Sequence, residues 1–172
     1  MTTAGRSAEG GGTIVPWLSS DEQTAWRSFL TGATLLFDHL DHDLRESSGL
    51  SLPEYEILVR LSESPERRLR MAELADSVSH SRSRVTHTIA RLERTGLVDR
   101  RACASDGRGV NAHLTERGWQ RLVEAAPRHV SRVRAALVDQ VSPADLEAVG
   151  RVFRAVSDAV TAGSGEEHRV AG

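Results

Sequence analysis

Three observations predict a mainly α-helical fold that contains one short β-hairpin. Apolar residues recur at helical spacing over two long segments, 19–48 and 119–162. Between these segments lie two short amphipathic helices, which a polar turn at 79–83 would separate. Two strand-like stretches follow the pair and flank a glycine-rich loop tip at 105–109. Together they predict a winged helix-turn-helix domain joined to long helices.

The central helix pair begins at 71–78, where apolar residues recur once per turn. Ser81 is placed to accept a hydrogen bond from a free backbone N–H and so to cap a second helix. Gly96 would end that helix, because glycine readily adopts the left-handed conformation common at helix C-termini. The apolar face of the second helix consists of Val85, Ile89 and Leu92. This second helix could lie in a DNA major groove.

A β-hairpin is predicted directly after the helix pair. Residues 97–101 and 110–114 have the pattern of strands, with a loop tip at 105–109 between them. Residues 67–70 are expected to form a short extended segment that pairs with this hairpin. Thr115 then provides an N-cap for the next helix. The hairpin would be the wing of the domain.

Residues 71–118 resemble the winged helix of the MarR (multiple antibiotic resistance regulator) family of bacterial transcription factors. In helix order the resemblance extends over roughly residues 20–162. The motifs that carry it are Arg91-Leu92-Glu93, Gly96-Leu97-Val98, Arg100-Arg101, Asp106-x-Arg108 and Leu114-Thr115-x-x-Gly118. The resemblance implies an intertwined homodimer that binds a pseudo-palindromic site in double-stranded DNA. It also implies a repressor that a small aromatic or phenolic effector releases.

The predicted wing tip departs from the family pattern. Gly107 and Gly109 flank Arg108 at positions where the family often has larger or more basic residues. We therefore expect fewer wing contacts with DNA than is usual.

The charge distribution favours a nucleic-acid partner although the 172-residue chain has a net charge of −2. Segment 67–108 contains ten arginines and five acidic residues, a net charge of +5, which leaves −7 on the remainder. A basic segment in an acidic body is typical of a protein that contacts phosphates at one end. The alternative is that these arginines form an ordinary solvated face.

The sequence divides into four predicted regions. A disordered arm spans 1–18, the winged helix-turn-helix region spans 50–118, and a loose tail spans 163–172. The segments 19–48 and 119–162 form a helical dimerisation region, with a kink or break expected near Pro127. No apolar run approaches the ~20 residues needed to span a bilayer, and no secretory signal is recognisable. A cytoplasmic protein without a membrane partner is therefore expected.

The predicted DNA contacts lie on the second helix of the pair and on the wing. Arg82 and Arg84 are candidates for guanine O6 and N7, and Arg91 is expected to brace the helix or touch the DNA backbone. Arg108 would enter the minor groove, oriented by Asp106. The full set is Ser81, Arg82, Ser83, Arg84, Thr86, His87, Arg91, Arg101, Asp106 and Arg108.

An effector site is a further prediction, because an apolar cavity with one arginine suits an aromatic acid. The candidate lining residues are Trp26, Arg27 and Tyr55. The alternative is that the two aromatic rings belong to the core and that Arg27 is solvated.

Three further residues suggest other functions. Cys103, the single cysteine, could sense oxidants beside Arg100 and Arg101, or be an incidental small residue of the hairpin. His39 and His42 could ligate a metal, although a polar helix side explains them as well. No catalytic residues, metal site or cofactor motif are predicted. A winged-helix interaction module without DNA binding remains the alternative function.

Overall fold

The computed structural model describes residues 16–78, 81–103 and 106–170, and the side chains of 106–108 and 163–170 lie outside this description. Most of the predicted N-terminal arm, 1–18, therefore also lies outside the described residues. The chain divides into two compact units, 1–35 and 36–172, whose boundary falls within the first helix. The two units are described separately.

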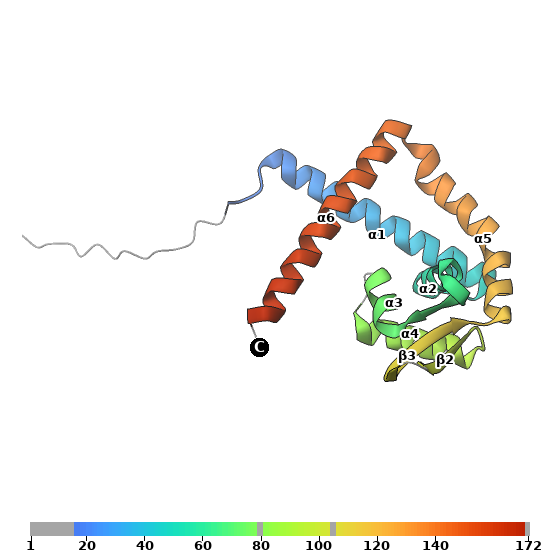
Figure 1. The fold of residues 1–172 in the computed structure, drawn as a ribbon. Coiled ribbons are helices and arrows are strands. Elements are labelled where there is room, and N and C mark those ends of the chain that lie inside the picture. Colours follow the sequence, from blue (N-terminus) through green and yellow to red (C-terminus); the bar gives the residue numbers. More distant parts are fainter. Residues whose placement is uncertain (1–15, 79–80, 104–105, 171–172) are drawn as a thin grey trace, which may run out of the picture. The chain divides into compact units, whose positions relative to one another are not determined.

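The fold is mainly helical and carries one small sheet, as the sequence predicts (Figure 1). The elements in chain order are helices α1 (Ser20–Ser48) and α2 (Leu52–Glu63), a 3₁₀ turn (Pro65–Arg67), strand β1 (Arg68–Arg70), helices α3 (Met71–Ser77) and α4 (Arg82–Arg94), strands β2 (Val98–Cys103) and β3 (Asp106–Leu114), helix α5 (Glu116–Ala136), a 3₁₀ turn (Val138–Gln140) and helix α6 (Pro143–Val170). Helices α3 and α4 form the predicted pair, and β2 and β3 form the wing.

The sheet is antiparallel, with strand order β1-β3-β2. The prediction that residues 67–70 pair with the wing is confirmed, since β1 pairs with β3 from Arg68↔His113 to Arg70↔Asn111. The predicted loop tip at 105–109 is wrong, because 106–109 belong to β3. A register shift between Ala102 and Cys103 lets the ladder continue to Cys103↔Asp106.

The winged-helix core lies between α2, α3, α4 and the sheet (Figure 1). The predicted apolar face of α4 is confirmed, since Val85, Ile89 and Leu92 are at most 1% exposed. The other side chains that are almost completely buried are Leu44, Ile57, Leu58, Leu61, Leu74 and Val98. This burial holds the recognition helix α4 by one side only and leaves its opposite side in solvent.

Local capping interactions determine where α4 and α5 begin and end. The Ser81 hydroxyl accepts a hydrogen bond from the Arg84 N–H at 3.3 Å, which confirms the predicted cap of α4. Gly96 follows this helix with a φ of 70°, the left-handed value expected there. At the start of α5, the Thr115 hydroxyl accepts from the Gly118 N–H at 3.0 Å and donates to the Gly96 carbonyl at 2.8 Å.

The sequence predicted a kink or a break of the long helix near Pro127. No break occurs there, because helix α5 continues through Pro127 and ends at Ala136. Proline removes one backbone hydrogen bond, to the Val123 carbonyl, and the helix continues on both sides of this position. The predicted loose tail, 163–172, is also wrong in its first part, because α6 extends to Val170. Each added helical residue gains a backbone hydrogen bond, which offsets the cost of Gly163 and Gly165.

Both units carry apolar side chains in solvent. In the first unit, Trp26 and Phe29 of α1 are 50% and 40% exposed, with ring centroids 5.6 Å apart. In the second unit, the exposed apolar residues of α6 are Val149, Val152, Phe153, Val156 and Val160. None of the helices in the described residues is long and apolar enough to cross a membrane.

Candidate nucleic-acid interface

Helix α4 presents a polar, basic surface along its first two turns. Val85 points into the core, and its neighbours on both sides are exposed. The exposed residues here are Ser81, Arg82, Ser83, Arg84, Thr86 and His87. The structure therefore brings together six of the ten predicted contact residues on one solvent-facing helix surface.

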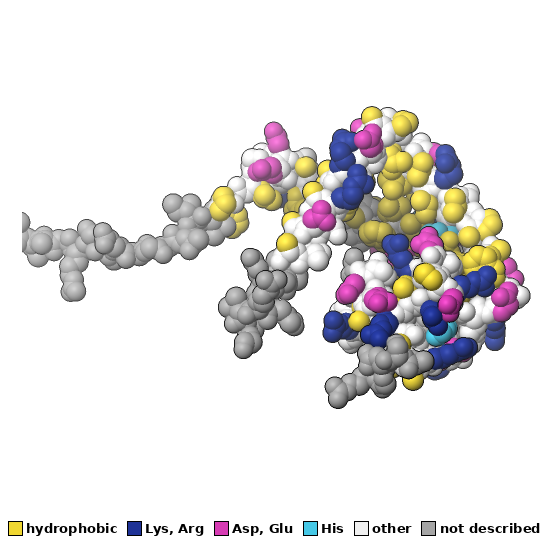
Figure 2. Space-filling model, in the orientation of Figure 1, with side chains coloured by type: hydrophobic (Ala, Val, Ile, Leu, Met, Phe, Trp, Pro, Cys, Tyr) yellow, Lys and Arg dark blue, Asp and Glu magenta, His cyan; other side chains and the backbone are white. Residues whose placement is uncertain are grey.

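The arginines in and around the interface differ in whether a neighbouring carboxylate neutralises their charge. Arg100 pairs with Glu93 at 2.7 Å and Arg101 with Asp99 at 3.1 Å, so each is partly neutralised by its neighbour. Among the described residues, no carboxylate forms an ion pair with Arg82 or Arg84. Figure 2 shows basic side chains spread with acidic ones over the winged-helix part. Arg82 and Arg84 are therefore the two arginines in the first two turns of α4 whose charge is available to an external anion.

Arg91 is engaged within the protein. Its Nε lies 2.9 Å from Oε1 of Glu54, a carboxylate on α2 that is 3% exposed. The sequence predicted that Arg91 either braces the helix or touches the DNA backbone, and this ion pair is a bracing contact. Glu54 itself was missed. The Ser51-x-x-Glu54 spacing of a capping box was the signal that could have revealed it.

The wing supplies the remaining predicted contacts. Arg101 is exposed on β2. Asp106 and Arg108 belong to β3, but their side chains lie outside the described residues, so their roles stay predictions. Cys103 is half-buried near the end of β2, where Arg70 Nη2 lies 3.6 Å from its Sγ.

The three predicted effector residues belong to different units of the structure, so the site that they would form stays a prediction. Trp26 and Arg27 belong to the first unit, where Arg27 is exposed and donates a hydrogen bond to the Gln23 side chain at 3.2 Å. Tyr55 belongs to the second unit and is 7% exposed in its core. Its ring packs on His129, with centroids 4.4 Å apart, and burial raises the pKa of Tyr55 while lowering that of His129.

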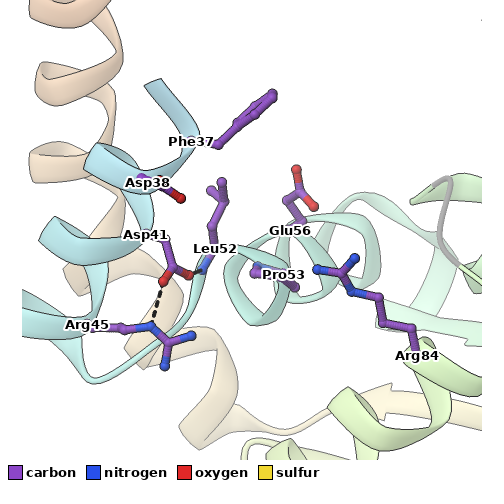
Figure 3. Close-up of a pocket in the computed structure, with 8 residues that line it drawn as sticks. All are labelled: Phe37, Asp38, Asp41, Arg45, Leu52, Pro53, Glu56 and Arg84. Atoms are coloured by element: carbon purple, nitrogen blue, oxygen red, sulfur yellow. Dashed lines mark hydrogen bonds and ion pairs between the residues drawn. The ribbon is translucent and has the colours of Figure 1, made fainter. Parts of the chain in front are cut away.

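A cavity of about 420 Å³ lies between the second half of α1, the start of α2 and the recognition helix (Figure 3). In the close-up, the Arg84 guanidinium and the Glu56 carboxylate lie across from Asp38 and Asp41. The residues that line the cavity are Phe37, Asp38, Asp41, Arg45, Leu52, Pro53, Glu56 and Arg84. The sequence did not reveal this cavity, because its wall combines three segments that only the tertiary fold brings together.

A second charge cluster joins α1 to α5. Asp43, 6% exposed, accepts hydrogen bonds from Arg128 Nη2 at 2.7 Å and Arg132 Nε at 2.8 Å. The hydrogen bonds from Arg128, opposed by burial and reinforced by Arg132, lower the pKa of Asp43 to about 2. The i, i+4 spacing of the two arginines places both on one face of α5. Sequence reasoning missed this cluster because the acid is 85 and 89 residues away from its partners.

The histidines considered as metal ligands lie on the surface of α1. His42 Nε2 is 3.4 Å from the Glu46 carboxylate, one helical turn away. Within the described residues, no group of three or more potential ligands is arranged to hold a metal ion.

The fold and this surface define the class of the protein: a winged helix-turn-helix protein whose recognition helix presents basic and hydroxyl side chains. A sequence model of the MarR family matches residues 48–109. A MarR-family regulator of Streptomyces coelicolor, Sco3205, is 45% identical to the chain. The match covers 84% of this chain and 91% of that one, with a TM-score of 0.82, and Sco3205 was solved in complex with DNA.

Further relatives agree with this match. AbsC, another MarR-family regulator of S. coelicolor, is 40% identical over 86% of this chain and 99% of its own, with a TM-score of 0.82. The transcriptional repressor YetL of Bacillus subtilis is 33% identical over 52% of this chain. The matched segment spans about half the length of the curated relatives, 53% for YetL. The chain belongs to the MarR family.

Proposed function

We propose that this protein is a transcriptional regulator that binds double-stranded DNA sequence-specifically as a homodimer. The observation that carries the proposal is helix α4, whose first two turns expose Arg82 and Arg84, for which the described part of the chain provides no carboxylate partner. The similarity to Sco3205, solved in complex with DNA, supports it, as does the similarity to curated repressors. A cytoplasmic location follows from a chromosomal target.

The proposed docking places the N-terminal half of α4 in the major groove. Arg82 or Arg84 would donate two hydrogen bonds to guanine O6 and N7, while the hydroxyls of Ser81, Ser83 and Thr86 would meet phosphates. Arg101 and the wing residue Arg108 would extend the contact to the neighbouring groove. In this arrangement an arginine recognises a base, and the hydroxyl side chains position the helix on the DNA backbone.

The homodimer is proposed from the exposed apolar faces. Five apolar residues of α6 are at least 37% exposed, and Val123 and Val130 of α5 are 50% and 53% exposed. Apolar surface of this kind favours burial against a partner. A symmetric pair would present two recognition helices to half-sites about one DNA turn apart.

Repression relieved by a small aromatic or phenolic effector is the finer part of the proposal. The cavity beside α4 supports it, because Phe37 and Leu52 offer apolar contacts and Arg84 offers a positive charge. A ligand carboxylate bound there would compete with DNA for Arg84 and favour the state that does not bind DNA. The candidate residues Trp26, Arg27 and Tyr55 remain a separate prediction for the effector site.

The test is a fluorescence anisotropy titration with the intergenic DNA beside the protein's own gene, a scrambled duplex and two salt concentrations. Binding of a dimer to the intergenic DNA at least a thousandfold tighter than to the scrambled duplex, weakening with salt, is expected. Equal affinity for several unrelated intergenic duplexes and the scrambled one would reject sequence-specific regulation. Absence of binding to all of them would favour the interaction module.

The effector test adds panels of aromatic acids and aromatic amines to the same titration. We expect an acid to weaken DNA binding at least tenfold. The cavity also carries Asp38, Asp41 and Glu56, so release by an amine alone would reject the acid class. Peroxide with a Cys103→Ser control distinguishes an oxidant sensor, which would lose DNA binding in the wild type only.

A further inference from the structure

Glu54 carries a buried negative charge at the start of α2. Its Oε2 accepts hydrogen bonds from the Ser51 N–H at 2.8 Å and from the Ser51 hydroxyl at 2.7 Å. The Ser51 hydroxyl in turn accepts from the Glu54 N–H, which closes a capping box. A buried carboxylate is costly unless its lone pairs are satisfied, and these bonds occupy one oxygen only.

The other oxygen of Glu54 holds the recognition helix. Oε1 lies 2.9 Å from Arg91 Nε, and Arg91 is 47% exposed at its side chain while Glu54 is 4% exposed. Arg91 therefore reaches from the surface of α4 to a fixed point on α2. Removing Arg91 would leave the buried carboxylate without its ion-pair partner.

The same turn of α2 is also tied to α1. Asp41 Oδ1 accepts a hydrogen bond from the Leu52 N–H at 2.8 Å, and Asp41 Oδ2 accepts from Arg45 Nε at 2.6 Å (Figure 3). The first turn of α2 is thus a junction that anchors the second half of α1 by Asp41 and the recognition helix by Glu54.

Apolar packing alone does not define the orientation of α4. Val85, Ile89 and Leu92 bury its inner face, but apolar contact is not directional. The Arg91–Glu54 ion pair instead joins one defined point of α4 to a buried, fixed point on α2, and it lies two turns from Arg84, which makes it suited to limit rotation of the helix. Base recognition demands such precision, since sites must be held to about 0.5 Å.

We propose that Glu54 is a positioning residue for DNA recognition, and that Arg91 acts on DNA affinity through Glu54 without contacting phosphate. This inference rests on the proposed function. Glu54, a buried carboxylate on α2, thereby contributes to sequence discrimination by α4.

The experiment compares Glu54→Gln, Arg91→Gln and the double variant with the wild type, on specific and scrambled duplexes over a salt series. Each single variant should lower specific affinity roughly tenfold and leave scrambled-duplex affinity and the salt slope unchanged. The double variant should bind no more weakly than the weaker single variant, because both changes break one link. Arg82→Gln is the matched control on α4, because it removes the same charge from an exposed arginine proposed to contact guanine, and its loss of specific affinity should add to that of Glu54→Gln.

Three results would overturn the proposal. A salt slope reduced by about one in Arg91→Gln would show a phosphate contact, and additive losses in the double variant would show that Arg91 acts independently of Glu54. Equal losses on both duplexes would show a general effect on binding. If Glu54→Gln does not fold, Arg91→Gln tests the same link from its exposed end.

Amide hydrogen exchange without DNA separates this inference from the proposed function. Glu54→Gln should speed exchange in the first turn of α2 and in α4, with α5 unchanged as the internal control. Unchanged exchange in α4 would contradict the positioning role even if the wild type binds DNA. Faster exchange in a protein that binds no DNA would support the role of Glu54 in holding α4. It would reject the proposal that the protein is a DNA-binding regulator.

Discussion

At the scale of residues, the buried carboxylates form ion pairs within the fold, whereas two exposed arginines of α4 have no such partner among the described residues. Asp43 and Glu54 are both less than 7% exposed, and each is bound by at least one arginine. Arg82 and Arg84 are exposed and have no carboxylate partner among the described residues. Substitution of the buried carboxylates should change stability or geometry. Substitution of the two exposed arginines should change DNA binding.

Arg84→Ala should weaken binding to the specific duplex by about 1–3 kcal/mol, because it removes a candidate bidentate contact with guanine. Thermal stability should change little, since Arg84 is exposed. Anisotropy titration measures the affinity, with Arg60→Ala on the exposed side of α2 as the control. Equal losses in both variants would point to net charge in place of a specific contact.

Asp43 should contribute a pH-dependent part of the stability. Its pKa is about 2 in the folded protein, below the 3.8 of an unperturbed aspartate. The carboxylate form is therefore favoured by folding, and this stabilisation is present above pH ~4 and is lost as the pH falls towards 2. Its size should be on the order of 1–2 kcal/mol, since both arginines are about half exposed and solvent screens the pairs.

Urea unfolding between pH 2.5 and 7 tests this prediction. The stability difference between the wild type and Asp43→Asn should be largest near neutral pH and shrink below pH ~4. Asp38→Asn, at an exposed position of the same helix, is the control. A difference that stays constant over the whole range would contradict the linkage.

At the scale of elements, local signals placed the helix ends, and one glycine governs how α5 meets the wing. A Cβ on Gly118 would lie 2.1 Å from the Leu97 carbonyl oxygen and 2.7 Å from Leu114 Cδ1. Both neighbours belong to well-packed parts of the core, so neither can move freely. Gly118 lies inside a helix and does not adopt a left-handed conformation. The close approach of these two neighbouring atoms therefore explains why this position is a glycine.

Gly118→Ala should destabilise the protein by about 3 kcal/mol or more, because the added methyl overlaps a backbone oxygen. Gly32→Ala in α1 is the matched control, since a Cβ there meets no heavy atom within 4 Å. The control should gain about 0.5–1 kcal/mol from helix propensity. Chemical denaturation measures both, and similar effects of the two substitutions would refute the close-approach explanation.

At the scale of the whole molecule, the exposed apolar faces carry the proposed assembly. Phe153→Glu should abolish the proposed homodimer, because it places a charge among apolar side chains that the interface would bury. Arg151→Glu, which introduces the same residue on the opposite side of α6, should leave the dimer intact. Sedimentation velocity gives the oligomeric state, and a dimeric Phe153→Glu protein would place the interface elsewhere.

The predictions from sequence succeeded where the signal is local or periodic. The apolar face of α4, its Ser81 cap and its Gly96 terminus need only a few neighbouring residues, and all three are confirmed. The predictions were wrong about how far a strand ladder and a helix extend. The wing ladder extends into 106–109 through a register shift, and α6 continues past Gly163.

The sequence by itself determined the winged-helix fold, the basic recognition helix and the MarR resemblance, because periodicity, caps and motif spacing are written along the chain. Only the tertiary structure decided that Arg91 binds Glu54, that Asp43 binds Arg128 and Arg132, and that a cavity adjoins Arg84. The physical reason is that these contacts join residues 37 to 89 positions apart, and their partners depend on how whole helices pack.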